Sequence, residues 1–146
     1  MKTKMITLFA VAILLTSTSF ATKNEEPSLQ IQNAFNGMFV NTTQVEWTSV
    51  SNLYQVTFMQ AGQYLTAYYN ISGEFISLSR NITISMLPLI LHGKLQDKLS
   101  NAWVSNCFEL YRENGTEYYV TLENSNEKTI YRSNNTDWST YKMIQK

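Results

Sequence analysis

The sequence predicts an α+β fold made of two consecutive copies of one helix followed by four short strands. Residues 45–79 contain four runs of alternating apolar and polar residues, joined by only a few residues each, as in a meander of hairpins. An amphipathic helical pattern precedes this stretch, and a second helix-then-strands pattern follows it. We therefore expect pseudo-repeats at about 27–83 and 84–146 within a single domain at 22–146.

The first 21 residues have the features of a secretory signal. Lys2 and Lys4 give a positively charged N-terminal region, and residues 5–15 are mostly apolar. Ser19 and Ala21 are small residues at the positions that a signal peptidase recognises. The apolar run is shorter than the roughly 20 residues that span a membrane. We expect cleavage after Ala21, release to the periplasm or the medium, and no membrane insertion afterwards. A retained anchor is the alternative.

Size and charge restrict the function of the mature chain. Cleavage leaves 146 − 21 = 125 residues, enough for one domain with a core. The mature charge is 9 − 11 = −2, with no basic footprint for nucleic acid and no polybasic run for a membrane surface. One cysteine, Cys107, cannot form an internal disulfide, which fits a bacterial periplasm better than a disulfide scaffold.

A helix is predicted to begin after Pro27 and Ser28 and to end near residue 40. Its apolar stripe has the spacing i, i+3, i+4, i+7, i+8 and consists of Ile31, Ala34, Phe35, Met38 and Phe39. This stripe is the natural cover for an apolar sheet face.

Strands at 45–50, 53–60, 63–70 and 74–79 follow, and their turns predict the pairing. Counting outward from the two-residue loop at 61–62 pairs Val56 with Ala67. Counting back across the preceding loop pairs Val45 with Phe58. The side facing the helix then consists of Val45, Trp47, Tyr54, Val56, Phe58, Leu65, Ala67 and Tyr69, and the other side of Glu46, Thr48, Gln55, Thr57, Thr66 and Tyr68.

The second half repeats this order. We expect a helix with Ser85 as N-cap and Pro88 in its first turn, ending near residue 100. Strands are expected at 102–113, 116–123, about 127–132 and 138–144. The Asn114–Gly115 turn pairs Tyr111 with Tyr118.

Several short motifs carry a family resemblance, in chain order Val45-x-Trp47, Tyr54-x-Val56-x-Phe58, Asn70-x-x-Gly73 and Leu87-Pro88. This pattern resembles the PepSY-like, β-lactamase-inhibitor-like (BLIP-like) family of exported bacterial proteins. The resemblance implies a two-layer arrangement in which both units share an antiparallel sheet with both helices on one face. It also implies an open sheet face, which grips a partner protein in the inhibitor. Ile71 and Ser72 stand where relatives often carry acidic residues.

Reactive residues do not form a recognisable constellation. His92 is the one histidine, and we expect a surface or partly packed side chain rather than a zinc ligand or base. Cys107 lies in a predicted strand and is expected to be a small buried apolar group, with a Cys–His nucleophile pair as the alternative. We predict no enzyme, no cofactor and no metal site.

Tyrosines on the outer sheet face are the candidate partner-binding residues. They are Tyr64, Tyr68, Tyr119 and Tyr131, the last two paired if the loop at 124–126 has three residues. Tyrosine also favours strands without any binding role. The leading hypothesis is an exported, non-catalytic, inhibitor-like binding module that recognises a protein or peptide through this face. The alternative is a periplasmic small-ligand or metal sensor in envelope stress, which needs polar groups gathered in a cleft.

Overall fold

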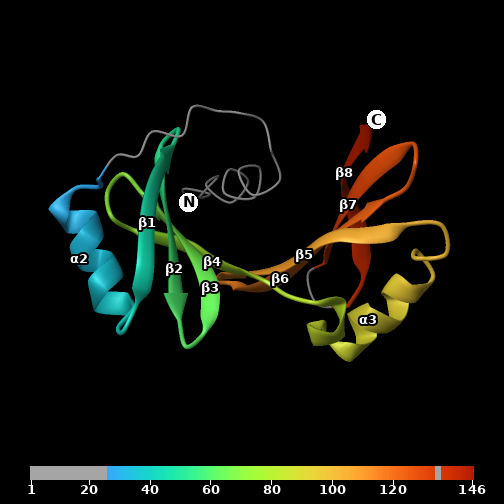
Figure 1. Cartoon of the computed structure of the whole chain (residues 1–146), viewed down its shortest axis with the longest axis horizontal. Coiled ribbons are helices and arrows are strands. Elements are labelled where there is room, and N and C mark those ends of the chain that lie inside the picture. Colours follow the sequence, from blue (N-terminus) through green and yellow to red (C-terminus); the bar gives the residue numbers. More distant parts are fainter. Residues whose placement is uncertain (1–25, 134–135) are drawn as a thin grey trace, which may run out of the picture. The chain divides into compact units, whose positions relative to one another are not determined.

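The computed structural model describes residues 26–133 and 136–146, and within them it confirms the predicted α+β class. Two α-helices and one short 3-10 helix accompany eight strands, which form one antiparallel sheet in the order β1-β2-β3-β4-β5-β6-β7-β8 (Figure 1). The expected signal at 1–21 lies outside the described residues.

The chain divides into two compact units, the first reaching Leu78 and the second beginning at Ser79. The first contains α2 (Leu29–Met38), β1 (Thr43–Val50), β2 (Leu53–Gln60), β3 (Gln63–Asn70) and most of β4 (Phe75–Asn81). The second contains η1 (Ile84–Met86), α3 (Leu89–Gln96), β5 (Trp103–Arg112), β6 (Gly115–Glu123), β7 (Glu127–Ser133) and β8 (Trp138–Gln145). Each unit thus has its own helix and its own strands, and the pseudo-repeat boundary at 83–84 stays a prediction.

Helix α2 begins where the sequence indicates but ends earlier. The Ser28 carbonyl accepts hydrogen bonds from the amides of Ile31 (3.0 Å) and Gln32 (3.1 Å), whereas the Ser28 side chain caps nothing. Phe39 is extended, with φ −118° and ψ 115°, so the helix stops at Met38. Met38 is 51 % exposed, which shortens the predicted apolar stripe.

The hairpin register of the first unit agrees with the prediction except at one bulge. Val56 pairs with Ala67 along β2 and β3, and Trp47 pairs with Val56. The predicted pair of Val45 with Phe58 is wrong, because the β1 register shifts between Thr43 and Glu46, where Gln44 has φ 51°. Val45 is exposed as a result.

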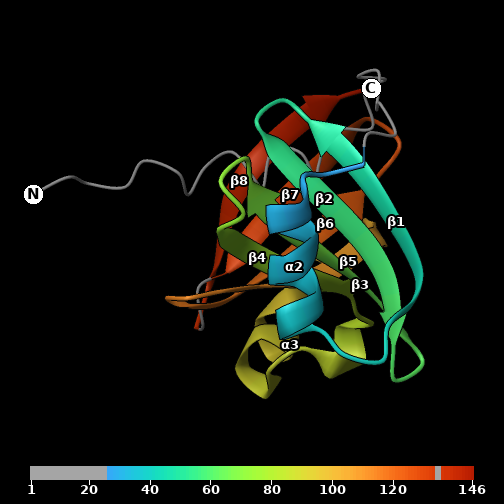
Figure 2. The same cartoon turned by 90° about the vertical axis from the view of Figure 1, so that its left-hand side faces the viewer.

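Aromatic packing joins α2 to the strands of its own unit. The Phe35 ring lies 5.0 Å from that of Phe58 and 5.4 Å from that of Trp47, both nearly edge-on. Ile31 and Val56 are buried in the same cluster. Figure 2 shows α2 lying across these strands as a separate layer, as the predicted stripe requires.

Proline 88 divides the second helical segment. The prediction of Ser85 as N-cap is wrong, because Ser85 belongs to η1 and Pro88 itself occupies the N-cap of α3. Leu87 is held at φ −64° and ψ 149°, an extended conformation that a residue before proline favours. Helix α3 ends at Gln96, several residues earlier than expected.

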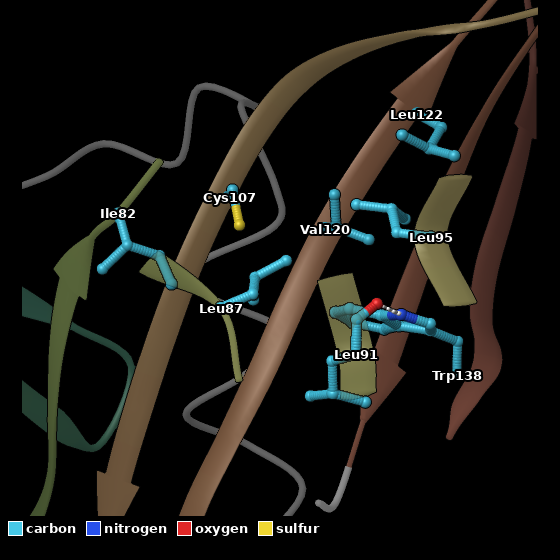
Figure 3. Packing of buried hydrophobic residues seen from close by; sticks show 8 residues of the cluster. All are labelled: Ile82, Leu87, Leu91, Leu95, Cys107, Val120, Leu122 and Trp138. Atoms are coloured by element: carbon cyan, nitrogen blue, oxygen red, sulfur yellow. Dashed lines mark hydrogen bonds between the residues drawn. The ribbon is translucent and has the colours of Figure 1, made fainter. Parts of the chain in front are cut away.

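The core of the second unit lies between α3 and the strands (Figure 3). Leu91 and Leu95 of α3 and Val120 of β6 are fully buried there, and Cys107 points to the same side as Val120, its partner in β6. The indole Nε1 of Trp138 donates a buried hydrogen bond of 2.9 Å to the Leu91 carbonyl. This bond fastens β8 to the helix.

The predicted pairing of Tyr111 with Tyr118 is wrong by two residues, although each side chain keeps its predicted face. Arg112 pairs with Gly115, so the turn residues are Glu113 and Asn114. Neither has the positive φ that a type I′ turn needs, and Gly115 takes φ 129° instead. The Asn–Gly signal therefore located the hairpin but not its register.

Leu91→Ala tests the importance of this core. We expect a loss of about 2–5 kcal/mol in the free energy of unfolding, because a fully buried leucine leaves a cavity when truncated. Leu89 of the same helix is 86 % exposed, so Leu89→Ala is the matched control, with an expected change within about 0.5 kcal/mol. Urea unfolding followed by circular dichroism measures both, and equal losses would contradict the packing.

Candidate partner-binding face of the second unit

The side of strands β5–β8 that points away from α3 is here called the open face. Val120 and Leu122 point toward α3, so Tyr119, Thr121 and Glu123 point the other way. Pairing with these residues adds Phe108 from β5 and Arg132 from β7. The open face is therefore the surface that the helix leaves uncovered.

A tight aromatic cluster fills the middle of the open face. The rings of Phe108 and Tyr119 stack at 4.9 Å and 7°, and Tyr141 meets Tyr119 edge-on at 5.8 Å. The Tyr119 hydroxyl donates to a Glu117 carboxylate oxygen at 2.9 Å. Burial and the nearby Glu117 charge raise the pKa of Tyr119. Its 0 % exposure shows that neighbours on the same face cover it, and the expectation of an exposed Tyr119 is wrong.

Two arginines border this cluster. Nη1 of Arg112 lies 3.4 Å from Oε2 of Glu117, and the Arg112 side chain is only 8 % exposed. No described residue accepts a hydrogen bond from its Nε or Nη2. The guanidinium of Arg132 lies 5.8 Å from the centre of the Tyr141 ring, a cation–π distance. The positive charges of Arg112 and Arg132 each oppose the rise in the pKa of Tyr119, so both act on the open face.

Trp103 reaches the open face because of a β-bulge. Trp103 pairs with Glu123 and Val104 with Leu122, but the next pair is Asn106 with Thr121, which leaves Ser105 as the extra residue. One extra residue reverses the alternation of a strand. Without it Trp103 would share the side of Cys107 and face the helix. With it Trp103 is 54 % exposed on the opposite side.

Glu123 holds this tryptophan site together. Its carboxylate lies 3.0 Å from Nζ of Lys146 and 3.3 Å from Nζ of Lys128, and it accepts a hydrogen bond from the bulge residue Ser105. Hydrogen bonds from Ser105 and Lys146 lower the pKa of Glu123 to about 2. Lys146 Nζ also lies 5.0 Å from the Trp103 ring centre. We call these five residues the Trp103 platform.

The four predicted tyrosines do not gather on one exposed face. Tyr64 is 56 % exposed and donates a hydrogen bond to the Gln44 side chain in the first unit. Tyr68 alternates away from the Val56 side as predicted but is 1 % exposed, so the expectation of an exposed side chain is wrong.

Tyr131 lies on the opposite side from the one predicted. It pairs with Val120 rather than Tyr119 and faces α3. A three-residue loop would pair Glu123 with Glu127, but Glu123 pairs with Lys128 and the Asn124 amide donates to the Glu127 carbonyl at 3.0 Å. The Asn124 side chain holds this turn, because it accepts hydrogen bonds from the amides of Asn126 (2.8 Å) and Glu127 (2.9 Å). This shift of one residue in register reverses the face of every following side chain of β7.

Tyr131 instead borders a pocket of about 170 Å³ on the helix side of the second unit. Lys98 Nζ lies 4.7 Å from the centre of the Tyr131 ring. Asn101 and Asn124 add polar groups, and Leu122 adds an apolar wall. The pocket has room for a small polar molecule.

Cys107 and His92 are placed as expected for packed side chains. Cys107 is 5 % exposed, and burial raises the pKa of its thiol to about 11, which disfavours the reactive thiolate. His92 is half-buried on α3. Within residues 26–133 and 136–146 no group of three His, Cys, Asp or Glu side chains is placed to hold a metal ion.

No family model matches the chain, and no curated protein does. Solved structures do. A BLIP-like protein from Bacteroides fragilis has a TM-score of 0.70 at 18% identity, covering 83% of this chain and 87% of that one. A DUF2874 family protein from Bacteroides ovatus has a TM-score of 0.74 at 14% identity, covering 83% and 89%. The fold is BLIP-like.

A third similar structure comes from a Bacteroides eggerthii protein provisionally assigned to the periplasm, with a TM-score of 0.74 at 11% identity, covering 83% of this chain and 90% of that one. At these identities the likeness establishes the BLIP-like fold alone, and the PepSY resemblance stays a prediction. In the part of the chain described, no helix is long and apolar enough to cross a membrane.

The Trp103 platform predicts a pH dependence of stability. The pKa of Glu123 is depressed in the folded chain from 4.5 to about 2, so its ionised form stabilises the fold above pH 4.5, and this contribution disappears as the pH falls toward 2. Chemical unfolding across this pH range should therefore show Glu123→Gln less stable than the native chain at neutral pH, with the difference vanishing near pH 2.

The turn variant Glu113→Gln is the control, because Glu113 is exposed and forms no ion pair with a described residue. If the stability difference between Glu123→Gln and the native chain is the same at pH 7 and pH 2, the ionised Glu123 carboxylate does not stabilise the Trp103 platform.

Proposed function

We propose that this chain is an exported, non-catalytic binding module that recognises a protein or peptide through the open face of its second unit. The observation that carries the proposal is Trp103, which the Ser105 bulge turns out of the helix-covered side to 54 % exposure. β-Bulges commonly re-aim side chains at functional positions.

The energetic argument is that an ordered, exposed tryptophan is well suited to binding. Tryptophan is among the residues most enriched at energetically dominant interface positions. Lys146 lies over the ring and is itself fixed by Glu123, so the platform is arranged before a partner arrives. Such pre-organisation reduces the entropy that binding costs.

Two further observations support the proposal. The sequence of the first 21 residues is typical of an export signal, and one protein of the same fold is provisionally assigned to the periplasm. The described open face presents aromatic and basic side chains, while Cys107 lies on the helix side with a raised thiol pKa. An inhibitor-like role rests on likeness of fold alone.

The pocket beside Tyr131 favours a second candidate function, the binding of a small carboxylate. Lys98 is the cation at its edge, and no described residue forms an ion pair with it. Glu127 also lines the pocket, so a ligand carboxylate binds on the Lys98 side, away from the Glu127 charge. Asn101 and Asn124 can supply hydrogen bonds beside it.

Trp103→Ala tests the first function. With the tagged chain as bait in envelope extract of the native host, we expect recovery of the specific partner to fall about thirtyfold, since an energetically dominant tryptophan contact is worth about 2 kcal/mol. The matched control is Tyr111→Ala, which removes an aromatic residue of similar exposure, 50 %, from the helix side of the same strand.

Recovery with Tyr111→Ala should equal that of the native chain, and both variants should melt as cooperatively as it does. A partner that Trp103→Ala still captures in full, or that both variants lose equally, would place the binding surface elsewhere.

A thermal-shift screen with small mono- and dicarboxylates tests the second function. A ligand that binds the native pocket should raise the melting temperature by about 2–5 °C at saturating concentration. The shift should disappear in Lys98→Ala and persist in Lys94→Ala, whose lysine lies on α3 and is paired with Asp137 at 3.1 Å. A flat screen, or equal shifts in both variants, would remove this candidate.

A further inference from the structure

The open face of the second unit is strongly biased toward positive charge. Among the described residues it carries five basic side chains, Arg112, Lys128, Arg132, Lys142 and Lys146, and two acidic ones, Glu117 and Glu123. The whole chain, by contrast, has a formal net charge of zero. We propose that the open face binds an acidic, extended segment of its partner protein, an inference that rests on the proposed function.

The ion pairs of this face leave cations in excess. Glu123 is occupied by Lys128 and Lys146, and Glu117 lies against Arg112. No described residue forms an ion pair with Arg132 or with Lys142. Lys142 is exposed and Arg132 half-buried, so a carboxylate approaching from solvent meets two uncompensated charges.

Arg112 adds a charge that solvent screens poorly. Its side chain is 8 % exposed, its single carboxylate contact is at 3.4 Å, and Nε and Nη2 have no acceptor among the described residues. A buried guanidinium acts through a lower effective dielectric than water provides. It therefore strengthens the positive potential over the neighbouring Tyr119 and Glu117.

Strands β1–β3 of the first unit lack this bias toward positive charge. On β1–β3 of the first unit, the side that points away from α2 carries Glu46 with the neutral residues Thr48, Gln55, Thr57, Thr66 and Tyr68, and no lysine or arginine. The two pseudo-repeats thus share a strand pattern but not a surface charge. This difference favours one charged docking site.

The aromatic residues favour a protein segment over a nucleic acid. Binding of single strands needs exposed ring faces on which bases can stack. The faces of Phe108 and Tyr119 are occupied by each other, and both rings are buried. Trp103 is exposed, but Lys146 Nζ lies over its ring. An acidic segment can instead place carboxylates at Arg132 and Lys142 while its apolar side chains contact the edge of Trp103.

Fluorescence anisotropy with labelled twelve-residue peptides tests the proposal. The probes alternate phenylalanine with glutamate, glutamine or lysine, and a labelled oligodeoxynucleotide and a heparin fragment represent other anions. We expect the glutamate peptide to bind about tenfold tighter than the glutamine peptide at low salt, with the difference lost near 0.5 M salt because exposed ion pairs are screened.

Matched double variants locate the site. Arg132→Gln with Lys142→Gln should weaken the glutamate peptide about tenfold and leave the glutamine peptide unchanged. The control, Arg80→Gln with Lys94→Gln, removes the same two charges from the helix side of the same unit and should change neither. Thermal unfolding confirms that both doubles remain folded.

Three results would overturn the proposal: equal binding of the glutamate and glutamine peptides, equal weakening by both double variants, or tighter binding of the oligonucleotide or heparin to the same residues. None of these disproves a binding module, because Trp103→Ala can still abolish partner capture when the partner is not acidic. Conversely, an acidic peptide bound equally by the native chain and by Trp103→Ala would support the charge inference while removing Trp103 from the function.

Discussion

Burial of Val120 against α3 is the contact that fixes the direction of the other side chains in the second unit. Side chains alternate along a strand, so once Val120 and Leu122 face the helix, Tyr119 and Glu123 must face away. The hydrogen bond from Trp138 to the Leu91 carbonyl extends this constraint to β8 at the other edge of the unit. Helix α3 therefore covers one side of these strands, and the side chains that point the other way form the open face.

Bulges are the points at which the two units diverge. Trp47 and Trp103 stand early in the first strand after each helix. In β1 the irregularity precedes the tryptophan, so Trp47 stays against Phe35 in the core. In β5 it follows the tryptophan, at Ser105, and Trp103 is turned outward. One unpaired residue thereby converts a core position into a surface one, and Glu123 stabilises the converted geometry through Ser105, Lys128 and Lys146.

The open face combines rigidity and charge in a way that fits recognition. Its middle is packed by the stack of Phe108 on Tyr119, which supports the surface without being available for contact. Its accessible parts are Trp103 and the cations Arg132 and Lys142, which form no ion pair with a described residue. The packed aromatic middle and the charged residues around it resemble the buried centre and polar rim of protein interfaces. The Tyr131 pocket lies on the other side of these strands.

By itself, the sequence determined the fold class, the number and order of the described strands, the β2–β3 register and most residues of the first core, because alternation and helical spacing are local properties of the chain. It could not determine the faces of Trp103 and Tyr131. The face of Trp103 depends on one extra residue, Ser105, and the face of Tyr131 on a one-residue register shift at the turn held by Asn124. The choice between registers is made by hydrogen bonds formed only in the folded sheet. The burial of Tyr119 was likewise decided by Phe108 and Tyr141, which lie near it only in the tertiary structure.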